Sequence, residues 1–264
     1  MSKIAIFTIA TNKYSDYWWK MVKSADRFLF VNDELTFHVF TEKNLDLNRL
    51  HKKLKRSKVV VHKIPNLQWP HATLYRYKYI AKFGNGLSDD FIMHIDADMI
   101  VVPHKSFKIS EFLSNHSVAL VRHPGYWRDL FPINIYFYIF NPVYIYRDAK
   151  LFIKYGNLGT WSKSKNSRAF ISRAKRKEYF CGAVWFGRKK NIVELAQELD
   201  NLTDLDMRDG TTPIWNDESY LNYWATNNEK ISLQPSFCFA ENYKNLLNVE
   251  PFIIALEKDK NAYK

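Results

Sequence analysis

A run of apolar residues interrupted by two carboxylates constrains this chain more than any other segment. Residues 91–102 read Phe-Ile-Met-His-Ile-Asp-Ala-Asp-Met-Ile-Val-Val, which is long enough for a buried strand and too short to span a membrane. Buried charge is costly unless it is paired or bound to metal, so Asp96 and Asp98 need a partner. Carboxylates so spaced at a strand end can share a hard divalent cation, which can hold a diphosphate. The segment therefore indicates nucleotide-sugar chemistry, with a strand end and an aspartate-rich turn as the alternative.

Strands and helices alternate through the first hundred residues, which favours an α/β domain with a largely parallel sheet. Residue patterns predict strands at 3–9, 35–41, 58–64, 91–95, 118–122 and 179–187, and helices at 17–30, 73–83, 192–199 and from about 213. Ligands of such sheets bind beyond the carboxyl ends of the strands. We therefore expect Tyr14, in the loop after the first strand, to lie on the same rim as Asp96 and Asp98.

Composition and charge narrow the class of protein. The 264 residues can bury a full core, and the net charge of +12 is uneven, because residues 147–177 hold ten Lys or Arg and one acid, Asp148. Nucleic acid, anionic lipid, acidic substrates and a plain solvated surface are all compatible with this charge. No zinc-finger, RNA-binding or basic-zipper pattern accompanies it, however, so we expect no nucleic-acid partner. Cys181 and Cys238 give no disulfide framework, and the chain starts as a strand rather than a signal peptide, which predicts a cytoplasmic location.

Six segments, in chain order, resemble glycosyltransferase family 6, the family of the ABO blood-group and α-1,3-galactosyltransferases and their bacterial relatives. They are residues 9–14, 67–76, the D-x-D-M of 96–99, the H-P-G-Y of 123–126, 179–183, and the W-N-D-E-S-Y-L-N of 215–222. The resemblance implies one GT-A catalytic domain over 1–264, with a Rossmann-like nucleotide-binding half (1–102) merged with an acceptor-binding half (103–264). It implies retaining α-1,3 transfer of galactose or N-acetylgalactosamine from the UDP-sugar to a glycan hydroxyl.

The resemblance also assigns donor-binding roles. Asp96 and Asp98 would hold Mn²⁺ (or Mg²⁺) across the diphosphate; many bacterial relatives carry N-x-N and work without metal, so the intact pair predicts metal dependence. Tyr14 and Trp69 would line the uridine pocket, with core packing as the alternative for Trp69. Arg76 would bind phosphate or sugar oxygen, unless it is a surface arginine on a helix. The other expected donor-site residues are Ile9, Ala10, Thr11, Thr73, Ala97, Cys181, Gly182, Ala183, Asp217 and Lys258. Of these, the small residues 181–183 would leave room for an acetamido group.

Glu218 is the expected catalytic carboxylate, facing the anomeric carbon either as nucleophile or as support for attack from the front face. An ordinary helix N-terminus, in which an acid caps free N–H groups, is the alternative for this segment. The resemblance places His123, Thr160 and Trp215 with Glu218 at the acceptor. A turn role for His123 and core packing for Trp215 are the competing interpretations.

Residues at about 128–158 form an insertion relative to the family. The aromatic run 131–146 and the cations after it suit the headgroup region of an anionic bilayer, which would place the enzyme at the inner membrane face near a lipid-linked glycan; an extra packed lobe is the alternative. The expected acceptor is an oligosaccharide or such a lipid-linked glycan. A catalytically silent glycan- or membrane-binding protein on the same fold and a nucleic-acid binder are the rival functions. The Asp96, Asp98 and Glu218 set favours the enzyme, because a binder needs no diphosphate cation.

Overall fold

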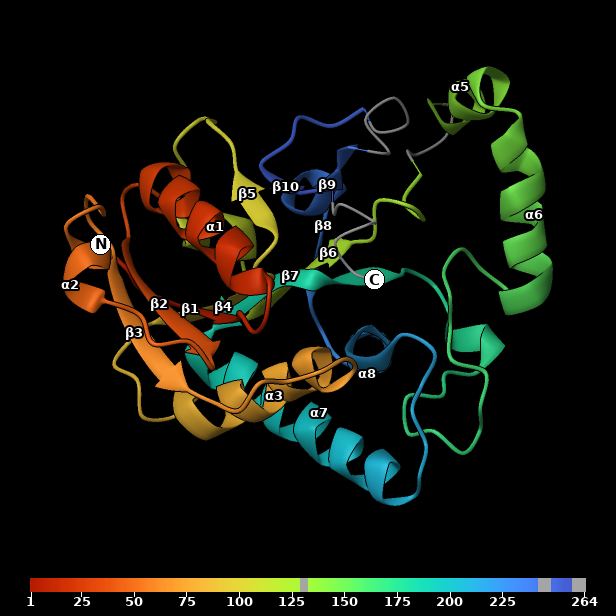
Figure 1. The fold of residues 1–264 in the computed structure, drawn as a ribbon. Coiled ribbons are helices and arrows are strands. Elements are labelled where there is room, and N and C mark those ends of the chain that lie inside the picture. Colours follow the sequence, from red (N-terminus) through yellow and green to blue (C-terminus); the bar gives the residue numbers. More distant parts are fainter. Residues whose placement is uncertain (129–132, 242–247, 258–264) are drawn as a thin grey trace.

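The computed structural model describes residues 1–128, 133–241 and 248–257, and it has an α/β architecture built on one large sheet (Figure 1). The seven strands of this sheet lie in the order β3-β2-β1-β4-β7-β6-β8. They are β1 (Lys3–Ile9), β2 (Glu34–Thr41), β3 (Lys58–Lys63), β4 (Phe91–Ile95), β6 (Val118–Arg122), β7 (Phe180–Arg188) and β8 (Ile231–Leu233). All neighbours are parallel except at β7, which runs antiparallel to both β4 and β6. The predicted α/β class with a largely parallel sheet is confirmed.

A smaller sheet and the helices complete the described structure. The second sheet has the order β5 (Met99–Val101), β10 (Ile253–Ala255) and β9 (Phe239–Ala240). The helices are α1 (Tyr14–Phe28), α2 (Leu47–His51), α3 (His71–Gly84), α4 (Ile109–Leu113), α5 (Ile133–Phe140), α6 (Val143–Tyr155), α7 (Lys189–Arg208) and α8 (Asn216–Asn227), with short 3₁₀ turns η1 (Arg173–Lys175) and η2 (Pro235–Cys238). In the described ranges, no helix combines the length and the apolar character that crossing a bilayer requires.

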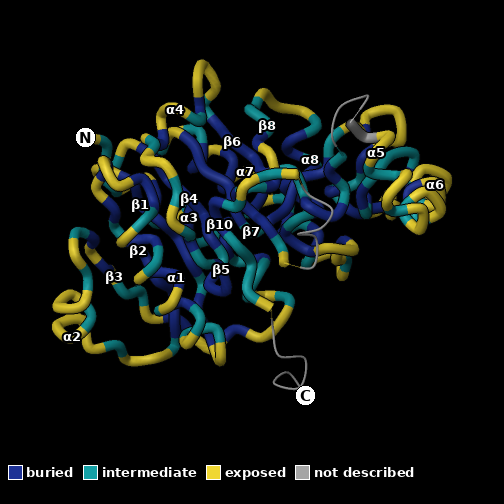
Figure 2. The backbone as a smooth tube through the Cα atoms, turned by 90° about the horizontal axis from the view of Figure 1, so that it is seen from above, coloured by how far each residue is buried: buried dark blue, intermediate teal, exposed yellow. Residues whose placement is uncertain are grey.

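The main sheet is buried on both faces, as Figure 2 shows by the dark colour of its central strands. Successive side chains of a strand point to opposite faces. Accordingly Ile4 and Ile6 of β1 pack in the cluster that holds Met21 of α1, while Ala5 and Phe7 join the cluster formed by α3 and α7. This two-sided burial explains why β1 is a continuous apolar run rather than an alternating one.

The predicted elements are present, with shifted ends. Helix α1 begins at Tyr14 rather than at residue 17, and α7 continues to Arg208, well beyond the predicted end at 199. The aromatic stretch 131–146 contributes two helices, α5 and the start of α6, separated at Asn141 and Pro142, where proline interrupts the helical hydrogen bonding.

The reversed direction of β7 determines what meets at the functional rim. Because β7 is antiparallel to β4, its first residues lie beside the last residues of β4: Val184 pairs with Ile95, and the Asp96 N–H donates to the Ala183 carbonyl at 2.9 Å. The carboxyl ends of β1 and β4 and the amino end of β7 therefore share one edge. Lys258, expected at the diphosphate, lies outside the described residues.

Candidate functional site

A cavity of about 820 Å³ opens at the carboxyl ends of β1 and β4. This volume is typical of a site for a ligand of nucleotide size. The wall residues are Ile9, Thr11, Asn12, Lys13, Tyr14, Asp16, Lys43, Leu67, Trp69, Ala72, Thr73, Arg76, Asp96 and Asp98. The structure thus brings together eight of the residues expected at the donor, including the three from separate segments, Tyr14, Arg76 and Asp98.

Two residues expected at the donor lie behind the cavity wall. Ala10 is fully buried and Ala97 is 2% exposed, and both side chains pack in the cluster beneath α1. The backbone N–H of Ala10 donates to the Phe40 carbonyl at 2.9 Å, which continues the pairing of β1 with β2 past the strand end. Ala10 therefore supports the loop that follows.

The loop after β1 is tied to the segment that precedes α3. Thr11 Oγ1 donates to the Leu67 carbonyl at 3.2 Å, and Asn12 Nδ2 donates to the same carbonyl at 3.3 Å. These bonds hold the loop that leads into Tyr14 against the segment that carries Trp69, and both residues line the cavity. Trp69 is 75% exposed, so the core-packing alternative is wrong for this residue, and its ring is open to a planar ligand.

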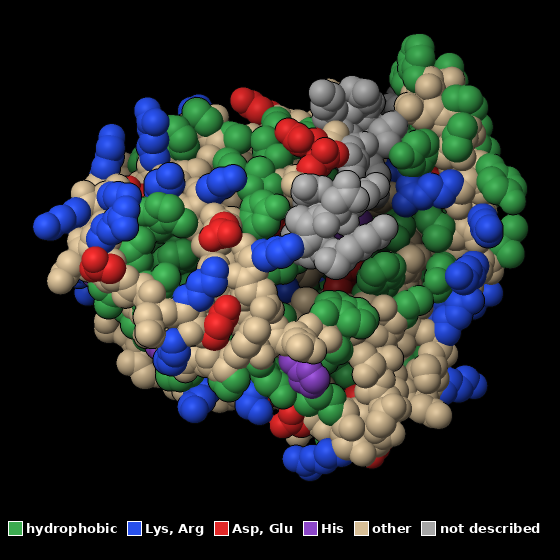
Figure 3. Space-filling model, viewed as in Figure 1, with side chains coloured by type: hydrophobic (Ala, Val, Ile, Leu, Met, Phe, Trp, Pro, Cys, Tyr) green, Lys and Arg blue, Asp and Glu red, His purple; other side chains and the backbone are tan. Residues whose placement is uncertain are grey.

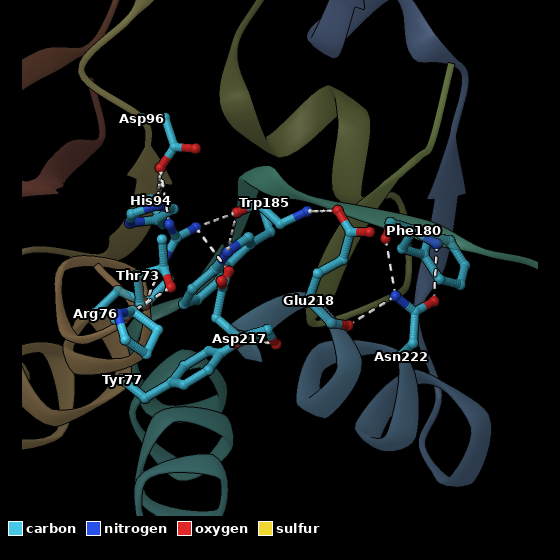
Figure 4. Close-up of polar contacts among 12 residues, drawn as sticks. Thr73, Arg76, Tyr77, His94, Asp96, Phe180, Trp185, Asp217, Glu218 and Asn222 are labelled. Carbon is cyan, nitrogen blue, oxygen red and sulfur yellow. Dashed lines mark hydrogen bonds and ion pairs between the residues drawn. The ribbon is translucent and has the colours of Figure 1, made fainter. Parts of the chain in front are cut away.

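Arg76 connects the donor cavity with the second half of the chain (Figure 4). Its Nη2 lies 3.1 Å from Asp96 Oδ1, and its Nη1 lies 3.2 Å from Asp217 Oδ2. Nη1 also donates to the Gly182 carbonyl at 2.6 Å, and Nε donates to the Thr73 carbonyl at 2.9 Å. Burial opposes the charge of Arg76, but Asp217 and Asp96 outweigh it and raise the pKa of the guanidinium. The side chain is 5% exposed, so the surface-arginine alternative is wrong.

His94 is a second partner of Asp96 that sequence reasoning missed. Its Nε2 lies 3.0 Å from Asp96 Oδ1, and its ring stacks on Trp185 with 5.2 Å between centroids. Burial, reinforced by the charge of Arg76, lowers the pKa of His94 to about 4, so the ring is neutral at pH 7 and donates from Nε2. The signal was present in the sequence, because His94 precedes Asp96 by two positions and such residues share one side of a strand.

Asp217 and Glu218 open α8, but their side chains turn toward β7 and α3 rather than toward the helix end. Glu218 Oε2 accepts from the Gly182 N–H at 3.0 Å, and the hydroxyl of Tyr179 is also hydrogen-bonded to this carboxylate. The residue at the N-cap is Trp215, whose side chain makes no capping bond. Burial raises the pKa of both Asp217 and Glu218 to about 7. The arrangement is that of a pair of partly protonated carboxyls beside a cavity, which is common at catalytic sites.

Gly182 is required here by close packing. A Cβ added to it would lie 2.7 Å from Asp217 Oδ2 and 3.6 Å from Arg76 Nη1. A side chain at this position would therefore displace the Arg76–Asp217 pair, whereas the room expected at residues 181–183 for an acetamido group stays a prediction. Its neighbour Cys181 is buried with Cys238, and both thiols are free, while Ala183 contributes its carbonyl to the Asp96 N–H.

A polar and aromatic chain leads from Glu218 to the residues expected at the acceptor. Thr160 Oγ1 lies 3.3 Å from the Tyr179 hydroxyl and 3.4 Å from the Tyr126 hydroxyl. The ring of His123 packs against Tyr126 at 4.7 Å between centroids. Tyr179 is the first residue of the motif at 179–183 but had no predicted role of its own, and its hydrogen bond to Glu218 makes it part of the site.

His123 and Trp215 differ in exposure. His123 Nδ1 accepts from the Gly125 N–H at 3.0 Å, so the turn role is present, and burial lowers the pKa of His123 to about 4. Trp215 is 50% exposed, which contradicts core packing and leaves one ring face open to a ligand.

Asp96 and Asp98 are the residues that could hold a divalent cation. Both carboxylates line the cavity, and hard oxygen donors suit Mn²⁺ or Mg²⁺. Within the part of the chain that the structure describes, no group of three or more His, Cys, Asp or Glu side chains is arranged to bind a metal ion. The remaining donors would be oxygen atoms of a diphosphate and of water, so the pair fits a cation shared with a bound ligand.

Comparison with known proteins agrees with this geometry. The model of the family described as glycosyltransferase family 6 matches residues 2–129 and 141–262. The O-antigen biosynthesis glycosyltransferase WbnI of Escherichia coli is 23% identical over 261 residues, covering 98% of this chain and 97% of that protein. Histo-blood group ABO system transferase 1 of Rattus norvegicus is 21% identical over 83% of this chain and 55% of its own length. Globoside alpha-1,3-N-acetylgalactosaminyltransferase 1 of Gallus gallus is 22% identical over 89% and 61%, respectively.

Proposed function

This chain belongs to glycosyltransferase family 6 and has a GT-A type of α/β fold, and from this premise we propose that it transfers galactose or N-acetylgalactosamine from a UDP-sugar to a glycan hydroxyl, forming an α-1,3 linkage with retention of configuration. A nucleotide-sugar donor and a glycan acceptor follow from the family. N-acetylgalactosamine and the α-1,3 linkage are supported by the name of the chicken relative, and an O-antigen glycan as acceptor by that of the Escherichia coli relative.

One observation carries the proposal: the donor cavity and the catalytic candidate are joined through a single buried residue. Arg76 lies on the wall with Asp96 and reaches Asp217 and Gly182, whose N–H holds Glu218. A diphosphate at the aspartates and a sugar extending toward Glu218 would therefore occupy one continuous site. Tyr14 and Trp69 at the other end offer aromatic surface for the uracil base.

We propose that Asp96 and Asp98 hold Mn²⁺ or Mg²⁺ when donor is bound. Such a cation would neutralise charge that develops on the departing UDP. Arg76 would keep Asp96 and Asp217 in place, because it forms an ion pair with each of them. Its positive charge offsets the electrostatic repulsion between the two carboxylates. His94 holds Asp96 from the strand side.

Glu218 is assigned the role beneath the anomeric carbon. Retention of configuration needs a covalent glycosyl-enzyme or front-face attack, and a carboxylate under the sugar favours both. The Gly182 N–H and the Tyr179 hydroxyl orient the carboxyl group. Because burial raises the pKa of Glu218 to about 7, the ionised form that either route needs becomes dominant only above that pH.

UDP release from UDP-galactose and from UDP-N-acetylgalactosamine, with and without Mn²⁺, tests the assignment. We expect slow hydrolysis without acceptor, loss of activity in EDTA, and loss in Asp98→Asn and Glu218→Gln. Glu111→Gln, which removes an exposed acid of α4, is the matched control and should behave as wild type. Undiminished turnover in EDTA would contradict the metal role, and UDP binding without any turnover would favour the silent binding protein.

A further inference from the structure

Helices α5 and α6 form an arm at the edge of the molecule (Figure 1), and many exposed side chains of this arm are apolar. Among the described residues, sixteen large hydrophobic side chains are exposed, and nine of them fall within residues 135–153. They are Ile135, Tyr136, Ile139, Phe140, Val143, Ile145, Tyr146, Phe152 and Ile153. Figure 3 shows hydrophobic side chains gathered along this edge. Such a concentration marks an interaction site, because scattered exposed apolar residues are ordinary and clustered ones are not.

The arm is fastened to the body by polar contacts on its inner side. Asp148 of α6 is 3% exposed and forms an ion pair with Arg128 at 2.7 Å, and the Tyr138 hydroxyl of α5 donates to the same carboxylate at 3.0 Å. Arg147 donates to the Gly125 carbonyl at 2.9 Å. These bonds fix the orientation of α6 about its own axis. The side of the helix opposite Asp148, which includes Val143 and Tyr146, is therefore exposed.

The surface beside the apolar face is positively charged. Seven cationic side chains between residues 150 and 177 are exposed: Lys150, Lys154, Lys163, Lys165, Arg173, Lys175 and Lys177. Residues 150–177 contain no Asp or Glu, and Asp148, just before them, is buried and paired with Arg128. Figure 3 shows Lys and Arg side chains along the same edge as the hydrophobic ones. Apolar and aromatic residues beside clustered cations are complementary to the interface of an anionic bilayer.

We propose that the α5–α6 arm is a docking surface for an anionic lipid bilayer, with its apolar side chains at the headgroup boundary and its cations on lipid phosphates. Charge favours this occupant over a second copy of the chain, since the chain carries +12 and self-association would bring like charges together. Helix α5 also lies in the interval between the two stretches that match the family model, so this apolar helix is not part of what the family model describes.

The arm adjoins the acceptor side of the site. Arg147 lies over the ring of Tyr126 at 5.4 Å, and Tyr126 is linked through Thr160 to Tyr179, beside Glu218. A docked molecule would therefore present its acceptor side near the lipid surface, which suits a lipid-linked glycan. This consequence rests on the proposed function, whereas the docking itself does not.

Co-sedimentation with vesicles tests the proposal. The wild-type protein should pellet with vesicles of equal parts phosphatidylglycerol and phosphatidylcholine, should pellet far less with phosphatidylcholine alone, and should be released by salt. Two double variants address the two parts of the surface: Phe140→Ser with Ile153→Ser, and Lys150→Glu with Lys154→Glu. Each should lower the vesicle partition coefficient about tenfold or more, since apolar area and lipid charge both contribute to interfacial binding.

Matched controls remove the same groups elsewhere. Val31→Ser with Val60→Ser and Lys52→Glu with Lys53→Glu change exposed residues outside the arm and should partition as wild type. Equal pelleting of arm variants and wild type would overturn the proposal. A second result would also overturn it: wild type does not bind vesicles but forms a dimer in sedimentation equilibrium, and the Phe140→Ser and Ile153→Ser changes abolish that dimer. UDP release without acceptor should be unchanged in the arm variants, so failure of docking is distinguishable from failure of the proposed activity.

Discussion

Asp26 in α1 is buried and Glu218 in α8 is partly buried, and the two carboxylates differ in how many hydrogen bonds the protein gives them. Asp26 accepts three backbone N–H bonds, from Lys55 at 2.8 Å, Arg56 at 3.1 Å and Ser57 at 2.9 Å. Burial by itself would raise the pKa of Asp26, but these bonds, beginning with that from Lys55, lower it overall. Glu218 receives one backbone N–H and one hydroxyl, and burial prevails, raising its pKa to about 7.

The difference separates a carboxylate that holds the fold from one available for chemistry. Around Asp26, the Arg56 side chain also donates to carbonyls at the end of α1 and beyond it, including that of Asp26 at 2.8 Å and that of Asp33 at 2.6 Å. These bonds give hydrogen-bond donors to backbone carbonyls that have no partner within the helix at its C-terminal end. The Glu218 carboxylate accepts fewer hydrogen bonds than Asp26, so its charged form is less stabilised. A carboxyl group in such surroundings can gain or lose its proton near neutral pH.

The largest expected effect comes from removing the charge of Glu218. Glu218→Gln should lower kcat by about 10³-fold, on the order of 4 kcal/mol, because in the proposed mechanism the carboxylate acts on the reacting carbon. The free energy of unfolding should change by less than ~1 kcal/mol, since a buried carboxyl with a raised pKa does not favour the charged form. Stopped assays of UDP release and urea unfolding measure the two quantities. If the free energy of unfolding fell by as much as the activation free energy rose, Glu218 would be a residue that stabilises the fold, like Asp26.

Asp26→Asn should produce the reverse pattern. The amide cannot accept all three N–H bonds, so we expect the free energy of unfolding, measured in urea, to fall by about 2–3 kcal/mol. The kcat of the folded fraction should stay within about twofold of wild type, because the contacts of Asp26 lie with Lys55, Arg56 and Ser57 rather than with the cavity walls. A large fall in kcat without a change in unfolding would assign Asp26 to the site.

Gly182→Ala tests how closely the site is packed. The new methyl group would lie 2.7 Å from Asp217 Oδ2, so the Arg76–Asp217 pair must shift. We expect kcat/KM for the donor to fall about 30-fold, roughly 2 kcal/mol, through misplacement of these groups. Gly86→Ala is the matched control, because its added Cβ would meet nothing closer than 3.9 Å. Full activity of Gly182→Ala would show that the pair adjusts freely.

The smallest effect concerns pH. Since the pKa of Glu218 is raised to about 7 and the ionised form is needed, kcat/KM should fall as pH drops through about 7, by about tenfold between pH 8 and pH 6. The Tyr179 hydroxyl lowers the pKa of Glu218, so Tyr179→Phe should move this limb upward by about half a pH unit. Rates measured across buffers of constant ionic strength give both midpoints. An unmoved limb in Tyr179→Phe would assign the titration to another group, such as Asp217.

The fold and the donor cavity were predictable because their signals are local. Apolar runs predict the strands, and the rule that parallel strands end at one edge brings Tyr14 and Asp98 together before any contact is known. The connection between the two parts of the site was not predictable. Arg76 meets the Gly182 carbonyl across 106 positions of sequence, and Tyr77 donates to the Asp217 carbonyl across 140, and no residue pattern specifies such pairs.

Two further features show the limits of sequence patterns. The close approach of Asp217 Oδ2 to Gly182 was not predictable, because it joins residues of separate elements. Helix α5, with the sequence Ile-Asn-Ile-Tyr-Phe-Tyr-Ile-Phe, has the composition of a buried helix, yet Tyr136 and Phe140 are exposed. Hydrophobicity predicts that a face will be covered but does not say whether the cover is the same chain or something else.

The reversed strand β7 has a consequence for how the enzyme can work. One edge of β7 is hydrogen-bonded to β4, which ends at Ile95 next to Asp96, and the other edge to β6, while the N–H of Gly182 in β7 donates to Glu218. Adjacent strands are about 4.8 Å apart and resist sliding. If the donor binds as proposed, the separation between its leaving group and its reactive carbon is fixed by one hydrogen-bonded sheet, with no hinge between Asp96 and Glu218. Gating of the proposed site would then be left to loops.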